Sequence, residues 1–99
     1  MDTIYGYISD EIIIERKRYF WGSLINLLYL RDNKYPQLDQ RIQTLINQFN
    51  GSINLFNDEP RIRTIIAWLE DARVNEKQFR KDILDAAGMV DKLGGGQDV

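Results

Sequence analysis

Residues 10–31 read DEIIIERKRYFWGSLINLLYLR. Apolar side chains recur in this stretch at spacings of three, four and seven, the period of one face of an α-helix. Acidic residues gather at its beginning and Arg31 ends it, a charge polarity that the helix dipole favours. The main apolar stripe consists of Ile13, Phe20, Leu24, Leu27 and Leu28. We therefore expect one long helix that begins at Ser9 or Asp10.

This expected helix is apolar on more than one side, because Ile14, Trp21 and Ile25 widen the main stripe. A helix of this kind is usually covered by neighbours on several sides. Gly22 lies inside it and disfavours it by about 1 kcal/mol relative to alanine. A glycine at such a position can also let another helix approach closely.

Three more segments with helical periodicity follow, separated by residues that begin or end helices. The breaks fall at residues 33–36, 50–52, 57–60, 75 and 94–96. The pattern predicts an all-α fold, a small bundle of four, or five, helices in a single domain of residues 1–99. The expected core consists of Phe20, Leu24, Leu27, Ile42, Leu45, Phe49, Ile62, Ile66, Phe79 and Ile83.

The two ends of the chain differ from the four periodic segments. Residues 1–8 are rich in types that favour strands, so we expect a short N-terminal arm that is flexible or β-like. A hairpin that turns at Ser9 and Asp10 is an alternative, although a lone hairpin is only marginally stable. Residues 94–99 form a glycine-rich tail.

The composition excludes several classes of function. The chain has 99 residues, a formal net charge of −2 and neither histidine nor cysteine. Disulfides, thiolate nucleophiles, Cys/His zinc sites and histidine general bases are therefore excluded. We expect a small acidic protein that is not an enzyme, with no catalytic residue, no cofactor and no metal site.

Acidic residues are the remaining candidates for catalysis. Two carboxylates can act as acid and base when burial or crowding shifts their pKa values. Asp82 and Asp85 lie at helical spacing, but they share their expected helix with Gln78, Lys81 and Lys92. This pattern is typical of a solvated charged face, so we expect no catalytic pair there.

No segment predicts export or a membrane span. The uncharged and mainly apolar run of residues 19–30 has twelve residues, whereas a spanning helix needs about 20. The first fifteen residues contain four acidic and no basic residues, unlike a signal peptide. We expect a soluble, cytoplasmic protein.

Aromatic residues are the main candidates for a binding site. Four short helices cannot bury all of them, and tyrosine and tryptophan often anchor protein–protein contacts. We expect partner binding at Tyr5, Tyr7, Tyr29 and Trp68, with Trp68 at the edge of its helix's apolar stripe. The predicted function is a helical protein–protein interaction module, a binding, inhibitory or assembly subunit that binds a partner or forms a homodimer.

Basic residues support an alternative function, contact with nucleic acid as an accessory subunit of a larger complex. Such side chains neutralise phosphates, and aromatic rings stack on unpaired bases. The candidates form two groups: Arg16, Lys17 and Arg18, and then Arg73, Lys77, Arg80 and Lys81. Consecutive residues of a helix do not share one face, and acidic residues lie among the second group. This alternative is therefore less favoured than protein binding.

Overall fold

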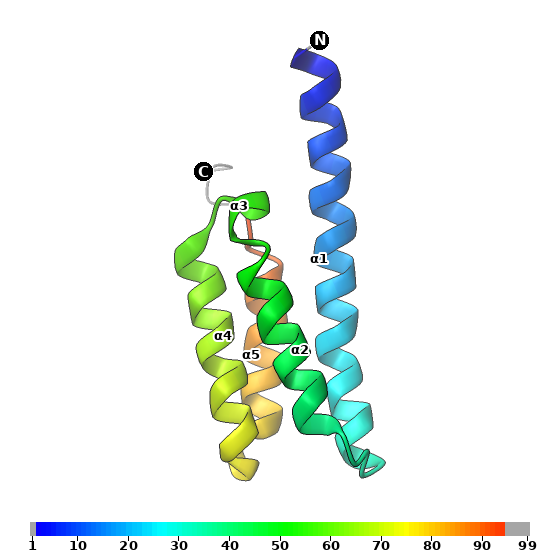
Figure 1. The fold of residues 1–99 in the computed structure, drawn as a ribbon, viewed down its shortest axis with the longest axis vertical. Helices are drawn as coiled ribbons and strands as arrows, with labels where there is room; N and C mark the ends of the chain where they lie inside the picture. Colours follow the sequence, from blue (N-terminus) through cyan, green and yellow to red (C-terminus); the bar gives the residue numbers. More distant parts are fainter. Residues whose placement is uncertain (1, 95–99) are drawn as a thin grey trace.

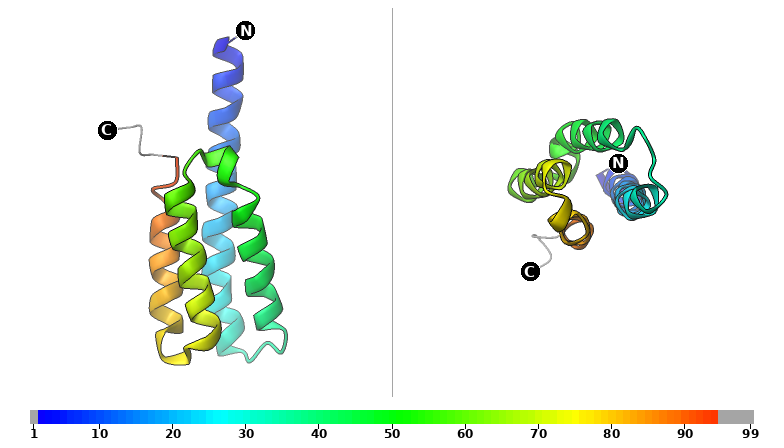
Figure 2. Two further views of the ribbon diagram at one scale, coloured as in Figure 1. Left: turned by 60° about the vertical axis from the view of Figure 1, so that its left-hand side comes forward. Right: turned by 90° about the horizontal axis from the view of Figure 1, so that it is seen from below.

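In the computed structural model, which describes residues 2–94 and the side chains of residues 10–94, four long helices run alternately down and up (Figure 1). They are α1 (Asp2–Asp32), α2 (Leu38–Asn50), α4 (Glu59–Val74) and α5 (Phe79–Val90). A short helix, α3 (Ile53–Phe56), and a 3₁₀ turn, η1 (Glu76–Gln78), lie in the connections. Each long helix packs against the next, and α5 closes the ring against α1 (Figure 2). The predicted all-α bundle is confirmed, and residues 2–94 contain no strand.

The start of α4 follows from local chemistry. Asp58 precedes it, and its carboxylate accepts hydrogen bonds from the backbone N–H of Arg61 at 3.4 Å and from the guanidinium of Arg61 at 2.9 Å. Pro60 occupies the first turn, where its missing N–H is not needed. Asn57 ends α3 with a φ of 52°, a left-handed conformation that asparagine tolerates. Capping and turn chemistry together separate α3 from α4.

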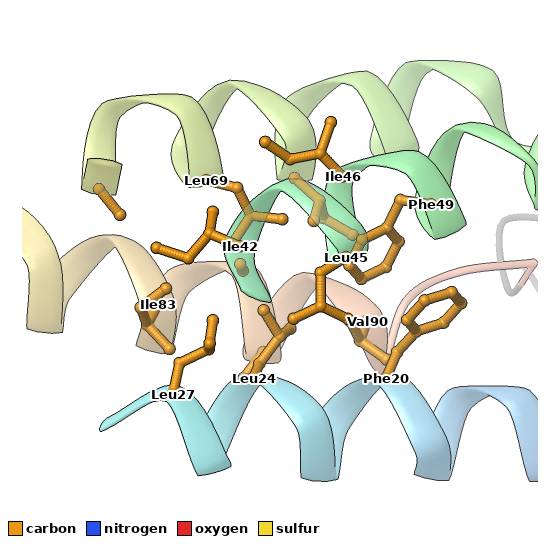
Figure 3. Packing of buried hydrophobic residues seen from close by; sticks show 14 of the residues in the cluster. Phe20, Leu24, Leu27, Ile42, Leu45, Ile46, Phe49, Leu69, Ile83 and Val90 are labelled. Atoms are coloured by element: carbon orange, nitrogen blue, oxygen red, sulfur yellow. The ribbon is translucent and has the colours of Figure 1, made fainter. Parts of the chain in front are cut away.

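The core lies between the four long helices along the length that they share (Figure 3). Phe20 of α1 stacks on Phe49 of α2, with ring centroids 3.9 Å apart. Nine of the ten expected core residues are buried, and the tenth, Ile66, is half-buried and packs against the same cluster. The apolar stripe of each helix therefore faces the stripes of its neighbours.

The N-terminal part of the chain differs from its prediction. α1 begins at Asp2 rather than near Ser9 or Asp10, and the described backbone forms neither a β-like arm nor a hairpin. The reason is that β-branched and aromatic residues disfavour a helix only slightly, and extending an existing helix adds one hydrogen bond per residue. Residues 95–99 of the glycine-rich tail lie outside the described residues.

The early start makes α1 much longer than its neighbours. A helix of 31 residues spans about 46 Å, which matches the longest dimension of the molecule, 49 Å. The N-terminal part of α1 therefore projects beyond the ends of the other helices (Figure 2). Within residues 2–94, neither α1 nor any other helix combines the length and the apolarity that crossing a membrane requires.

Candidate interaction surface

The side of α1 that faces away from the core carries a row of side chains, most of them exposed, here called the outer stripe. It consists of Ile14, Arg18, Trp21, Ile25 and Tyr29, of which Ile25 is half-buried and packs against the core. Their spacings of four, three, four and four are those of one helix face. Ile14 is 51 % exposed, Trp21 47 % and Tyr29 66 %. α2 and α5 pack against other parts of α1 (Figure 2), and no helix of the described chain covers Ile14, Trp21 or Tyr29.

The surface is hollow beside the N-terminal half of the outer stripe. An open depression of about 490 Å³ is lined by Ile14, Lys17, Arg18, Trp21 and Asp91. The Nζ of Lys17 donates a hydrogen bond of 2.7 Å to the backbone carbonyl oxygen of Asp91, which follows the last residue of α5. This contact suits the partial negative charge at a helix C-terminus. The depression therefore combines apolar, aromatic and cationic side chains.

Gly22 lies next to the outer stripe and is exposed. A Cβ atom added at this position would meet no heavy atom within 4 Å. Nothing in the described part of the chain therefore requires the lack of a side chain here, although glycine weakens a helix. The close approach of a second helix, which the sequence suggests for Gly22, does not occur within residues 2–94.

The predicted partner-binding residues have different surroundings. Tyr29 is exposed and belongs to the outer stripe, whereas Trp68 on α4 is half-buried and packs against the core. The side chains of Tyr5 and Tyr7 lie outside the described ones. Trp21 is exposed but is not among the predicted binding residues, because the sequence pattern places it on an apolar side of a covered helix. Its spacing of seven from Ile14 was the available signal.

The two predicted basic groups lie apart. Lys17 contacts Asp91 at the end of α5, whereas Lys77 lies in η1 and Arg80 at the beginning of α5. The rise of a helix places Asp91 and Arg80 about 16 Å apart along the axis. The fold therefore does not bring the two groups into one patch.

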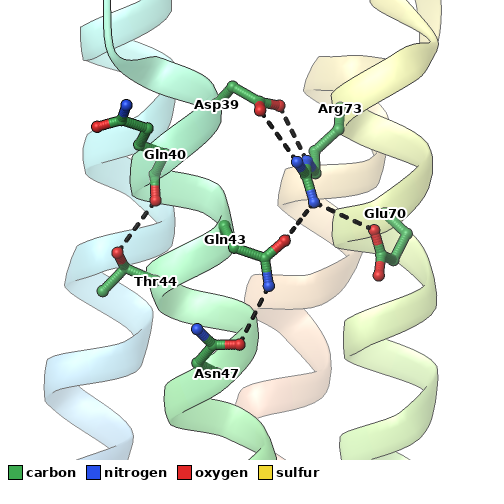
Figure 4. Close-up of polar contacts among 7 residues, drawn as sticks. All are labelled: Asp39, Gln40, Gln43, Thr44, Asn47, Glu70 and Arg73. Carbon is green, nitrogen blue, oxygen red and sulfur yellow. Dashed lines mark hydrogen bonds and ion pairs between the residues drawn. The ribbon is translucent and has the colours of Figure 1, made fainter.

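Arg73 is held by a polar network between α2 and α4 (Figure 4). Its guanidinium donates two hydrogen bonds to the carboxylate of Asp39, at 2.9 and 3.0 Å, and one to Gln43. It also lies 3.5 Å from the carboxylate of Glu70. The hydrogen bond with Arg73 lowers the pKa of Asp39. Arg73 thus joins two helices and has its charge balanced within the chain.

Asp82 corrects the prediction of a solvated acidic face. Only 6 % of Asp82 is exposed, and its Oδ2 atom has no hydrogen-bond partner in the described structure. Burial, followed by the contact with Asp71 of α4, raises the pKa of Asp82 to about 6. The cause is the packing of α4 against α5, which covers the side of α5 next to Ile83. Asp85 is half-buried, and its carboxylate pairs with Lys81 at 2.9 Å.

The contact between Asp82 and Asp71 does not form a metal site within the described residues. Residues 10–94 contain no group of three or more acidic side chains that could hold a metal ion. A buried carboxyl group beside a second one favours binding of a proton. Asp82 is therefore a candidate for pH-dependent stability.

Comparisons of the chain with protein-family models, with curated proteins and with solved structures find no match.

Proposed function

We propose that this chain is a non-enzymatic helical protein–protein interaction module and that the outer stripe of α1 is its binding surface. One observation carries the proposal: a row of exposed apolar side chains follows a helix that projects beyond its bundle. Monomeric proteins seldom leave a large apolar patch uncovered unless it has a function. Tryptophan, tyrosine and arginine are also the residue types enriched at the energetic centres of protein interfaces.

The core supports this surface from behind. Phe20 and Leu24 are fully buried, so they fix the rotation of α1 and with it the direction of Trp21. A surface whose backbone is already ordered loses less entropy on binding than a flexible one does. Side chains at spacings of three, four and seven suit a second helix laid along the first. The best fit for the outer stripe is therefore a helical partner.

A photocrosslinking experiment in the native cell tests the proposal. A benzophenone-bearing amino acid is placed at position 14 in the outer stripe and, as a matched control, at position 74. Val74 is also apolar and is 82 % exposed, but it lies at the end of α4. We expect crosslinks to protein at position 14 in at least about tenfold excess over position 74, because interface energy concentrates at a few residues. Equal yields at both positions, or none at position 14, would overturn the proposal.

Nucleic-acid contact stays the alternative and has its own test. Binding of labelled single- and double-stranded DNA is measured at low salt and then at rising salt. The proposal predicts no binding at low salt. Binding that weakens steeply with salt would support phosphate contacts and the alternative function.

A further inference from the structure

We propose that the occupant of the N-terminal half of the outer stripe is the α1 helix of a second copy of this chain, with the two α1 helices antiparallel. In this dimer Glu11 of each copy faces Arg18 of the other. The inference rests on the proposed function and deepens it, because it names the partner. A two-fold dimer requires a surface that is complementary to itself, and three features of α1 meet that requirement.

The first feature is the order of charges along α1. All the charged residues among residues 10–15 are acidic, and residues 16–18 are all basic. Glu11 and Arg18 are both exposed and lie seven residues apart on the same face. That spacing is about 10 Å along the axis, too far for an ion pair within the helix. Neither residue belongs to an ion pair among residues 10–94.

An antiparallel second copy pairs both charges at once. When the two-fold axis passes between residues 14 and 15, position 11 of one helix comes opposite position 18 of the other. The same operation produces a second Glu11–Arg18 pair on the other side of the axis. A parallel pair in register would instead place Glu11 beside Glu11, which is repulsive. The charges of α1 therefore favour the antiparallel dimer.

The second feature is the presence of apolar residues and a glycine near the two-fold axis. Ile14 of each copy lies at the axis and meets its equivalent. Trp21 and Gly22 come opposite the backbone of residues 7 and 8 in the other α1. Because Gly22 has no side chain and open space around it, the other helix can pack against it there without a clash. The dimer thus gives a role to the glycine that has none in the single chain.

The third feature is the free space around the outer stripe. The other helices pack along the C-terminal half of α1 (Figure 2), and they leave Ile14, Trp21 and Tyr29 of the stripe exposed. In an antiparallel pair the two bundles therefore lie at opposite ends and on opposite sides of the paired helices. Neither bundle blocks the other, and the two α1 helices can contact each other over most of their length.

Charge reversal tests the arrangement in the full chain. Sedimentation equilibrium of the unaltered protein is expected to give twice the monomer mass of 11.7 kDa. Glu11→Arg and Arg18→Glu are each expected to weaken self-association at least about tenfold, because each places like charges together. An equal mixture of the two variants is expected to recover the dimer, since every contact is then again between opposite charges. A mixture that stays monomeric would overturn the antiparallel arrangement.

Glycine substitution supplies the matched control. Gly22→Gln and Gly88→Gln each add a side chain at an exposed helical glycine with open space around it. Both are expected to raise the melting temperature, because glutamine favours a helix over glycine. Only Gly22→Gln is expected to weaken the dimer. Equal association of the two variants would overturn the helix contact at Gly22.

The outcomes separate this inference from the proposed function. A chain that sediments as a monomer at millimolar concentration, but crosslinks from position 14 to a different protein, would overturn the dimer and leave the proposed function standing. The absence of any crosslink at position 14 would overturn the proposed function itself.

Discussion

The inner and outer sides of α1 are both apolar, yet their surroundings differ completely. Phe20, Leu24 and Leu27 are fully buried, whereas Ile14 and Trp21 are about half exposed. The inner side has counterparts, such as Phe49, on the apolar stripes of other helices. Ile14 and Trp21 on the outer side have no such counterpart within the described chain. An apolar stripe in this protein is therefore buried where it faces the apolar stripe of another helix. The outer stripe of α1 faces none, and a partner is expected there.

The largest expected effect lies on the inner side. Leu24→Ala removes a fully buried side chain and leaves a cavity, so the free energy of unfolding is expected to fall by about 2–5 kcal/mol. Urea denaturation measures this change. A loss below about 1 kcal/mol would show that the inner side of α1 is not the centre of the core.

The next effect concerns Asp82, a polar residue inside the apolar part of the bundle. Its pKa is about 6 in the folded chain, against 3.8 for an ordinary aspartate. Between these two values the folded state binds more protons than the unfolded state, so this group's contribution to stability falls as pH rises through the window. The contribution is present below about pH 4, is lost above about pH 6, and amounts to at most about 3 kcal/mol.

Asp82→Asn is therefore expected to stabilise the protein at pH 7 by about 1–3 kcal/mol and to flatten its pH dependence. Asparagine keeps the shape of the side chain and removes the repulsion from Asp71. Urea denaturation at pH 4, 5, 6 and 7 measures the effect. Asp85→Asn is the control, because Asp85 is less buried and pairs with Lys81. Equal pH dependence in the Asp82 variant and the unaltered chain would contradict the assignment.

A smaller effect is expected on the face formed by α2 and α4. Arg73→Ala breaks the two hydrogen bonds to Asp39, and the pKa of Asp39 is expected to rise towards its usual value. Since Asp39 is well exposed, solvent screens the pair and the loss of stability is expected to be small. Nuclear magnetic resonance titration of Asp39 and urea denaturation measure these changes. Arg63→Ala, which breaks an exposed pair with Glu59, serves as the control with a smaller expected loss.

Much of the fold could be predicted from the sequence, because the apolar period within each helix marks the side that packs. The expected core residues illustrate this, with Ile66 alone reaching only half-burial. The first residue of α1 could not be predicted, since the weak helix preferences of residues 2–9 do not mark a boundary. The burial of Asp82 depends on how α4 lies against α5. It could not be predicted, because a charged residue in a sequence is expected to face solvent.

The candidate site was less predictable than the fold. Tyr29 was identified as exposed, but Trp21 was not, because α1 is apolar around its circumference and its pattern does not separate the inner from the outer side. The separation appears only when the other helices are in place. Trp68 shows the opposite case, an aromatic residue on a helix edge that packs against the core instead of facing outward.

The most direct test of the account compares Trp21→Ala with Leu24→Ala, two substitutions one turn apart on α1. Each variant carries the crosslinking residue at position 14, and its unfolding free energy is measured at a dilution where self-association is absent. Trp21→Ala is expected to reduce the crosslinks at least about tenfold and to change the unfolding free energy by less than about 0.5 kcal/mol. Undiminished crosslinks, or a loss of stability as large as that of Leu24→Ala, would contradict the assignment of the outer side of α1 as a binding surface.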